Sequence, residues 1–149
     1  MYYINREQLN ARFAFMAGLI EASREVIGQA DEDGSHALKR LAEERLLHLA
    51  IENITDIGSL MIDGFLMRDA SSYEDIVEIL LGEKVFPEEV GKPVIELVKL
   101  RKPLVQNYFE LDRSALKPHL ERLPGLLEQF AASAQSFIER ELGAAGQSL

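Results

Sequence analysis

Apolar residues recur every three to four positions along almost the whole chain, and this periodicity restricts the fold most strongly. The clearest apolar stripe lies in the segment 35–65 and consists of Leu46, Ala50, Ile54, Ile57, Met61 and Phe65. Such spacing places apolar side chains on one face of an α-helix. No stretch alternates apolar and polar residues with a period of two for long enough to predict a strand. The sequence therefore predicts an all-α protein.

Capping residues and prolines predict where the helices begin and end. The expected helices cover residues 6–29, 35–65, 73–81 and 87–101, with further turns over 104–109 and a last helix after Asp112. Asn5 and Ser72 are suitable N-caps for the first and third helices. We expect the chain to kink or restart at Pro103, and Pro118 and Pro124 to interrupt the last helix near its start. Amphipathic helices with short connections predict a four-to-five-helix up-and-down bundle.

Length and composition favour one globular domain. The chain of 149 residues can bury a sizeable core, and we assign the domain to residues 1–142 and a frayed tail to residues 143–149. No apolar run approaches a membrane span, and the first residues lack the pattern of a signal peptide. The absence of cysteine excludes disulfides, thiolate catalysis and cysteine-ligated zinc. We expect a cytoplasmic protein with no membrane contact.

The charge distribution is uneven. The net charge of −9 argues against a dedicated non-specific nucleic-acid binder, and we expect no DNA partner. Residues 1–100 hold 10 Lys and Arg against 19 Asp and Glu, whereas residues 101–149 hold 6 of each. The segment from Lys92 to Lys117 has six basic and three acidic residues, a local charge of +3. This segment is the first place to look for a contact with phosphate or RNA.

A polar stripe in the second helix carries the first candidate site. His48, Glu52 and Asp56 are spaced by four residues and share one helical face. They could coordinate a metal or form a proton-transfer pair. The alternative is a solvated or dimer-facing stripe beside Arg45. A carboxylate-bridged di-iron bundle requires Glu-x-x-His on two helices, which this chain lacks. We therefore favour the solvated stripe and expect no bound metal and no cofactor.

The stretch RKPLVQNY, residues 101–108, carries the second candidate site. Arg101 ends a predicted helix beside a proline, where a guanidinium group can contact a phosphate in bidentate fashion. Lys102 is a further candidate for phosphate contact. Tyr108 would lie on nearly the same face if the helix continued. The alternative is an arginine that interacts with the last carbonyls of its own helix, beside a half-buried tyrosine.

This stretch resembles the signature of the HEPN superfamily (higher eukaryotes and prokaryotes nucleotide-binding domains), and within it the HepT-like branch. The branch motif is Arg, four residues, His, one residue, Tyr, so that Arg101 and Tyr108 match its first and last members. The segment IDGFLMRDASSYEDIVEIL, residues 62–80, is also similar to a HepT-like subgroup. The resemblance covers nearly the whole chain.

The resemblance implies a homodimer of helical bundles in which two motif copies face a shared cleft. It implies the toxin side of a type VII-like toxin–antitoxin module of the HepT/MntA kind. In that family the toxin is a metal-independent endoribonuclease, and the antitoxin is a minimal nucleotidyltransferase that adenylylates the motif tyrosine. Tyr108 is then the candidate for modification, and RNA is the expected substrate.

Gln106 stands where the family motif has histidine. RNA cleavage without a metal requires the 2′-hydroxyl to lose a proton and the leaving oxygen to gain one. An imidazole can move these protons, whereas the amide of Gln106 can only form hydrogen bonds. His48 and His119 are the two histidines considered as substitutes, and His36 is the third in the chain.

Two functions from different classes remain open. The first is a HepT-like ribonuclease toxin with weak or lost activity, in which Arg101 contacts phosphate. The second is a catalytically silent dimeric HEPN bundle that acts as a binding or adaptor module. Gln106 and the acidic net charge favour the second, whereas the resemblance over the whole chain favours the first.

Overall fold

The computed structural model describes residues 1–30 and 36–144, and it contains helices and no strand within them. Its elements are α1 (Arg6–Gly28), α2 (Ala37–Gly64), α3 (Tyr73–Gly82), α4 (Glu88–Lys99), α5 (Arg101–Val105), the 3₁₀ turns η1 (Tyr108–Glu110) and η2 (Arg113–Ala115), and α6 (Lys117–Ala144). The all-α prediction is confirmed. The expected start of the second helix at Ser35 and the end of the proposed tail, 145–149, lie outside the described residues.

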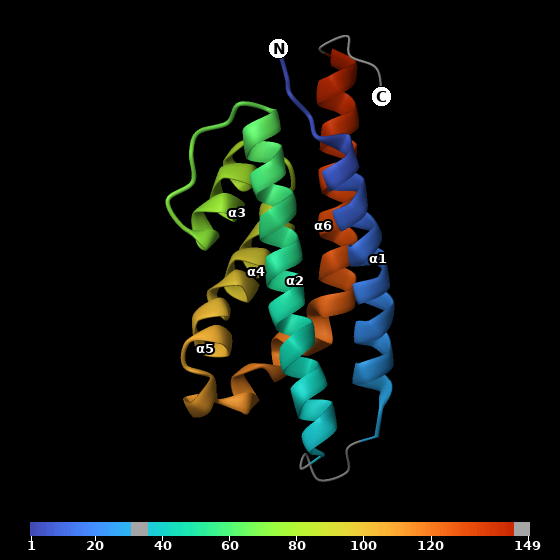
Figure 1. The fold of residues 1–149 in the computed structure, drawn as a ribbon, viewed down its shortest axis with the longest axis vertical. Coiled ribbons are helices and arrows are strands. Elements are labelled where there is room, and N and C mark those ends of the chain that lie inside the picture. Colours follow the sequence, from blue (N-terminus) through green and yellow to red (C-terminus); the bar gives the residue numbers. More distant parts are fainter. Residues whose placement is uncertain (31–35, 145–149) are drawn as a thin grey trace.

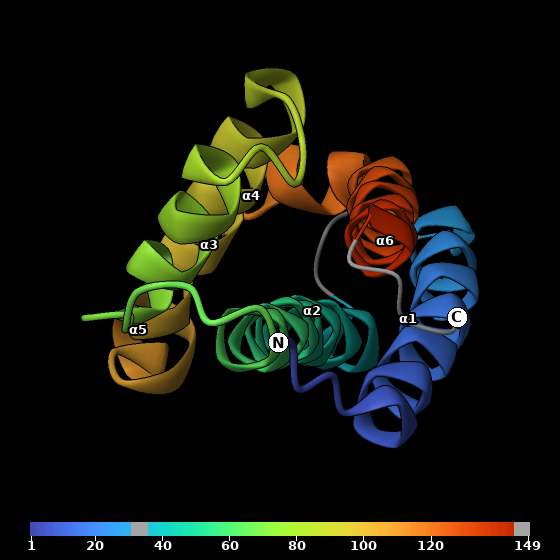
Figure 2. The same cartoon turned by 90° about the horizontal axis from the view of Figure 1, so that it is seen from above.

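The three long helices α1, α2 and α6 pack side by side, and α3, α4 and α5 lie along the other side of α2 (Figures 1 and 2). Successive long segments run in opposite directions, with α4 and α5 together forming the third column of the bundle (Figure 1). The helix α3 packs between α2 and α4. This arrangement is the expected up-and-down bundle with one additional short helix.

The core is built from the apolar stripes that the sequence predicts. All six residues of the stripe in the second helix are buried, and Leu9, Met16, Leu123, Leu127 and Phe130 from α1 and α6 join them. Gly58 lies on the buried face of α2, where α3 crosses closest to it, and Ile76 and Leu80 of α3 pack there. A side chain at this position would hold the two helices apart.

Two predicted N-caps are confirmed. The Asn5 side chain accepts a hydrogen bond from the backbone of Gln8 at 3.1 Å, and the Ser72 side chain accepts one from the backbone of Asp75 at 3.0 Å. Each cap satisfies one of the backbone N–H groups that a helix start leaves without a partner. Pro87 takes the N-cap position of α4.

The other prolines do not kink or interrupt the helices at the predicted positions. The chain restarts at Arg101, two residues before Pro103, and Pro103 becomes the third residue of α5. No break is needed there, because the first N–H groups of a helix have no partner within it. Pro118 occupies the second position of α6 for the same reason. Pro124 loses one hydrogen bond inside α6, yet the helix continues because the buried residues on both sides of it pack into the core.

The helical turns expected over 104–109 are confirmed only in part. α5 ends at Val105, and the chain makes a separate 3₁₀ turn, η1, that begins three residues later at Tyr108. Tyr108 therefore does not continue the helix that begins at Arg101.

An ion pair fixes the loop that leads into α3. Arg68 donates two hydrogen bonds to the two carboxylate oxygens of Asp75, both at 2.7 Å, and the backbone of Ser71 donates a third to the same carboxylate at 2.9 Å. The Arg68 guanidinium and the Ser71 donor hold the pKa of the Asp75 carboxyl well below its usual range. These bonds place Tyr73, the first residue of α3, against α5.

The N-terminal residues lie against the end of α2. The backbone N–H of Tyr3 donates to the carbonyl of Gly64 at 2.9 Å. The ring of Tyr2 packs edge-on against Phe65, with their centroids 4.8 Å apart, and its hydroxyl donates to Glu141 of α6 at 3.4 Å. The segment before α1 therefore joins the ends of α2 and α6.

Candidate functional site

Arg101 lies where three helices meet. As the first residue of α5, it donates a hydrogen bond from its Nε to Oε1 of Glu52 on α2 at 3.3 Å. Its guanidinium carbon lies 4.0 Å from the ring centroid of Tyr73, the first residue of α3. This is cation–π geometry. The arginine is thus held by groups from two other helices and does not interact with the carbonyls of its own.

Two further α2 residues extend this site toward solvent. Nε2 of His48 lies 3.8 Å from the same Glu52 oxygen that receives the Arg101 hydrogen bond. On the other side of the imidazole ring, Nη1 of Arg45 lies 3.3 Å from Nδ1 of His48. We call these five residues, Arg45, His48, Glu52, Tyr73 and Arg101, the Arg101 cluster. It is open to water, since the His48, Glu52 and Arg101 side chains are 32%, 35% and 26% exposed.

The other predicted motif residues lie on the surface beyond Arg101. Lys102 and Gln106 are exposed, and the backbone N–H of Gln106 donates to the Lys102 carbonyl at 2.8 Å at the end of α5. Tyr108 is 64% exposed in η1, and its ring contacts that of Phe109 with centroids 5.7 Å apart. The Tyr108 side chain is therefore largely open to solvent.

The side chains of the polar stripe of α2 pair with residues of different helices. Asp56 turns toward α1 and pairs with Arg12 at 3.5 Å, whereas Glu52 pairs with Arg101 of α5 and His48 lies beside Glu52. Across residues 1–30 and 36–144, no group of three or more His, Asp or Glu side chains has an arrangement that could hold a metal ion. The absence of a metal stays a prediction, and the structure shows instead that Glu52 binds the Arg101 side chain.

The remaining histidines lie apart from the Arg101 cluster. Nδ1 of His36 accepts a hydrogen bond from the backbone of Lys39 at 3.1 Å and caps α2. His119 lies near the start of α6, where burial and the nearby Arg122 lower the pKa of its imidazole. Of the three, only His48 contacts a residue that binds Arg101 in the described part of the chain.

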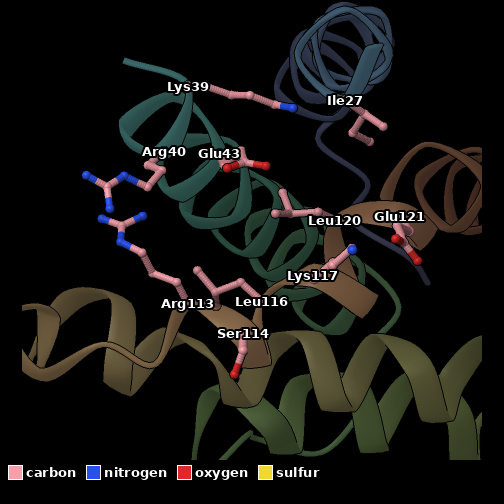
Figure 3. A pocket seen from close by; sticks show the side chains of 10 residues that line it. All are labelled: Ile27, Lys39, Arg40, Glu43, Arg113, Ser114, Leu116, Lys117, Leu120 and Glu121. Atoms are coloured by element: carbon pink, nitrogen blue, oxygen red, sulfur yellow. The ribbon is translucent and has the colours of Figure 1, made fainter. Parts of the chain in front are cut away.

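A basic pocket lies at the N-terminal end of α2, where α1, η2 and the start of α6 meet (Figure 3). Its volume is about 420 Å³, and its lining includes the cations Lys39, Arg40, Arg113 and Lys117 with the carboxylates Glu43 and Glu121. Arg113 also pairs with Glu44 of α2. The local positive charge of residues 92–117 is thus divided, because Arg113 and Lys117 line this pocket while Arg101 lies in its own cluster.

Two members of the Arg101 cluster have roles that sequence reasoning missed. The sequence predicts Tyr73 only as the first residue of a helix, because no spacing relates it to Arg101, 28 positions later. Glu52 was considered as a metal ligand, whereas the structure pairs it with an arginine. Both contacts depend on how separate helices pack, and a spacing pattern within one helix carries no signal for them.

The fold and the site together define a class: all-α HEPN-type proteins in which an arginine at a helix start precedes a tyrosine by seven positions. The chain belongs to the HepT-like family, described as "Ribonuclease HepT-like", which matches residues 16–133.

A relative from Bacillus subtilis strain 168 is 35% identical over 143 residues, with 96% of each chain covered, and is named putative RNase YutE. The solved structure of YutE, described as a cytosolic protein of unknown function, matches with a TM-score of 0.83 at the same coverage. A tri-AMPylated HEPN toxin from Shewanella oneidensis, in complex with an MNT antitoxin, matches with a TM-score of 0.77 at 16% identity over 86% of this chain and 96% of that one. This last match supports the fold. No helix in the described part of the chain is long and apolar enough to cross a membrane.

Proposed function

We propose that this chain is a cytoplasmic, metal-independent endoribonuclease on the toxin side of a HepT-type toxin–antitoxin pair, with Arg101 binding the phosphate that is cleaved. The observation that carries the proposal is the orientation of Arg101. Its Nε is bound to Glu52 and its face lies on Tyr73, while no described residue accepts a hydrogen bond from its terminal nitrogens. Two parallel N–H donors on a fixed guanidinium suit a phosphate group.

Gln106 limits the rate in this proposal. Its exposed amide can form a hydrogen bond with a ribose or phosphate oxygen, but it cannot accept and return a proton. A group that moves protons typically contributes about 10²–10⁴-fold to a rate. The wild-type protein should therefore cleave RNA slowly, and Gln106→His should raise the rate without the addition of a metal.

The test is RNA cleavage in excess EDTA with three variants. Arg101→Ala should abolish cleavage, and Arg101→Lys, which keeps the charge but loses the planar fork, should recover only part of it. Lys99→Ala is the control, because Lys99 is an exposed cation two residues away that pairs with Glu96 at 3.1 Å. Cleavage that survives Arg101→Ala in a folded protein would contradict the proposal.

We also propose that the antitoxin partner is a small nucleotidyltransferase that attaches AMP to Tyr108. The exposed hydroxyl of Tyr108 supports this, and so does the AMPylated state of the Shewanella toxin. Incubation with a small nucleotidyltransferase of the MNT type, together with ATP and Mg²⁺, should add AMP groups that mass spectrometry detects. The addition should be lost in Tyr108→Phe and kept in Tyr3→Phe, since Tyr3 is equally exposed at 68%.

The second candidate function is a silent dimeric adaptor that binds a partner without cleaving RNA. The replacement of the motif histidine by Gln106 and the net charge of −9 favour it. The two functions differ in one result. An adaptor gives no cleavage in the wild type, whereas a slow ribonuclease gives cleavage that depends on Arg101.

A further inference from the structure

The Arg101 cluster contains an imidazole that the proposed function does not use. Oε1 of Glu52 lies 3.3 Å from Nε of Arg101 and 3.8 Å from Nε2 of His48. The sum of these two distances, 7.1 Å, is the upper bound on the separation of the two nitrogens. One carboxylate oxygen therefore keeps a phosphate-binding group and a proton-transfer group within reach of the same nucleotide.

The contact with Arg45 decides which nitrogen of His48 carries the proton. Nη1 of Arg45 lies 3.3 Å from Nδ1 of His48, and a guanidinium group can only donate. Nδ1 must therefore accept this hydrogen bond, which leaves the single proton of the neutral ring on Nε2, facing Glu52. A carboxylate that faces one ring nitrogen, with the lone pair of the other directed outward, is the orientation of the imidazole in a carboxylate–histidine general base.

We propose that His48 is the general base of this protein and that Glu52 is the residue that positions it, so that Gln106 leaves the protein without an acid for the leaving oxygen. This inference rests on the proposed ribonuclease function. Arg45 is exposed, so its side chain can move from Nδ1 to a phosphate oxygen when RNA binds.

The reaction uses only the RNA, water and these side chains. Nδ1 of His48 takes the proton of the ribose 2′-hydroxyl while the 2′-oxygen forms a bond to phosphorus. The bond from phosphorus to the 5′-oxygen breaks, its electron pair stays on that oxygen, and water supplies the proton that makes a 5′-hydroxyl. The imidazolium then returns its proton to the hydroxide that remains. The products are a 2′,3′-cyclic phosphate and a 5′-hydroxyl, and Arg101 offsets the charge that builds up on the phosphate oxygens.

The other two histidines do not fit this role. His36 is used as the N-cap of α2, and it precedes Glu52 by sixteen residues, about 24 Å along a helix. His119 has Arg122 and Glu96 as its charged neighbours and contacts no member of the Arg101 cluster. His48 itself faces Arg45 and Glu52 of α2, while Arg101 of α5 reaches it through Glu52, and Tyr73 of α3 packs on that arginine.

The experiment compares His48→Gln with His119→Gln in the full chain. A glutamine at 48 keeps a polar side chain of similar length but cannot titrate. Cleavage of a short single-stranded RNA at pH 7 should fall by about 10²–10⁴-fold in His48→Gln and stay within about threefold of the wild type in His119→Gln. RNA affinity, measured by fluorescence anisotropy, should change little in either variant. The pH dependence of the wild-type rate should change in His48→Gln and stay the same in His119→Gln.

The positioning role of Glu52 has its own readout. In ¹⁵N-detected spectra of the wild type, the neutral His48 ring should carry its proton on Nε2. Arg45→Ala alone should keep the proton there, because the Glu52 carboxylate still faces Nε2, whereas Arg45→Ala combined with Glu52→Gln should mix the two tautomers while the protein stays folded. A structural role alone would leave the tautomer and the pH–rate profile unchanged.

The outcomes separate this inference from the proposed function. Wild-type cleavage rates in a folded His48→Gln protein overturn the role of His48 and leave the ribonuclease function intact. Cleavage seen only in Gln106→His also overturns it, because the wild type then lacks a working base. If His48→Gln abolishes cleavage and Arg101→Ala does not, the base is supported and the phosphate role of Arg101 is wrong. No cleavage by any variant means that the ribonuclease function and this inference both fail.

Discussion

Gly58 is the position where a single added methyl group should reveal how tightly α2 and α3 pack. A Cβ at this residue would lie 2.4 Å from Cγ2 of Ile76 and 3.4 Å from Cδ1 of Leu80. The first distance is about 1 Å shorter than an ordinary contact between carbon atoms. Gly58→Ala must therefore move α3, which also carries Tyr73 against Arg101.

The change in the free energy of unfolding caused by Gly58→Ala follows from two opposing effects. An extra methyl in a well-packed core costs about 1–3 kcal/mol. The branched Ile76 side chain is stiff at χ1, so its Cγ2 cannot rotate away freely, which favours the upper part of that range. Alanine stabilises the helix by about 1 kcal/mol relative to glycine because its helix propensity is higher. The free energy of unfolding should fall by about 1–2 kcal/mol, and Tm by about 2–8 °C for a domain of this size.

Gly18→Ala is the matched control. Gly18 lies inside α1, and a Cβ there would have nothing within 4 Å. It gains the helix propensity without the clash, so its Tm should equal or exceed that of the wild type. Both variants are to be unfolded by heat and by urea while helix content is followed by circular dichroism. Equal stability of the two variants would refute the packing argument. In an Ile76→Ala background, Gly58→Ala should cost clearly less, as a double-mutant cycle would show.

Three other predictions concern the ion pair, the oligomer and the metal content. The pKa of Asp75 is lowered in the folded protein, so its contribution to stability is complete above the unfolded pKa of about 4 and is lost as the pH falls below it. Asp75→Asn should flatten the decline of Tm below pH 5, and Asp69→Asn, at an exposed position, should not. Light scattering at micromolar concentration should give a dimer, consistent with the exposed Leu38 and Leu41 on α2. A mass near 16.8 kDa would contradict this. Elemental analysis should find no stoichiometric transition metal, and a metal ligated by Glu52 would be incompatible with its pairing to Arg101.

The sequence predicted those features of the fold that depend on neighbours within one helix. Asn5 and Ser72 act as caps because the groups they satisfy lie three residues away. Apolar spacing identified the buried face of α2 for the same reason. The prediction for Pro103 is wrong because a proline's effect depends on its position in the helix, and α5 starts at Arg101, two residues before Pro103.

The site was predictable only in part. The spacing of Arg101 and Tyr108 identifies both as candidate site residues. In the structure they lie in separate helical elements, α5 and η1, and do not share a helical face. The neighbours that control Arg101 come from α2 and α3, and their approach is a result of packing. The same holds for His48, whose nearness to Arg101 follows from a contact between Glu52 and another helix.

The N-terminal segment has a practical consequence for expression of the protein. Tyr3 is bonded to the last residue of α2, and a Cβ at Gly64 would lie 2.7 Å from Cδ1 of Ile4, so the segment lies in close contact with that helix end. Met1, in contrast, is 88% exposed. A purification tag placed before Met1 extends into solvent without displacing anything. A boundary drawn at the start of α1 would remove the Tyr2 ring from Phe65 and leave the ends of α2 and α6 without the residues that join them.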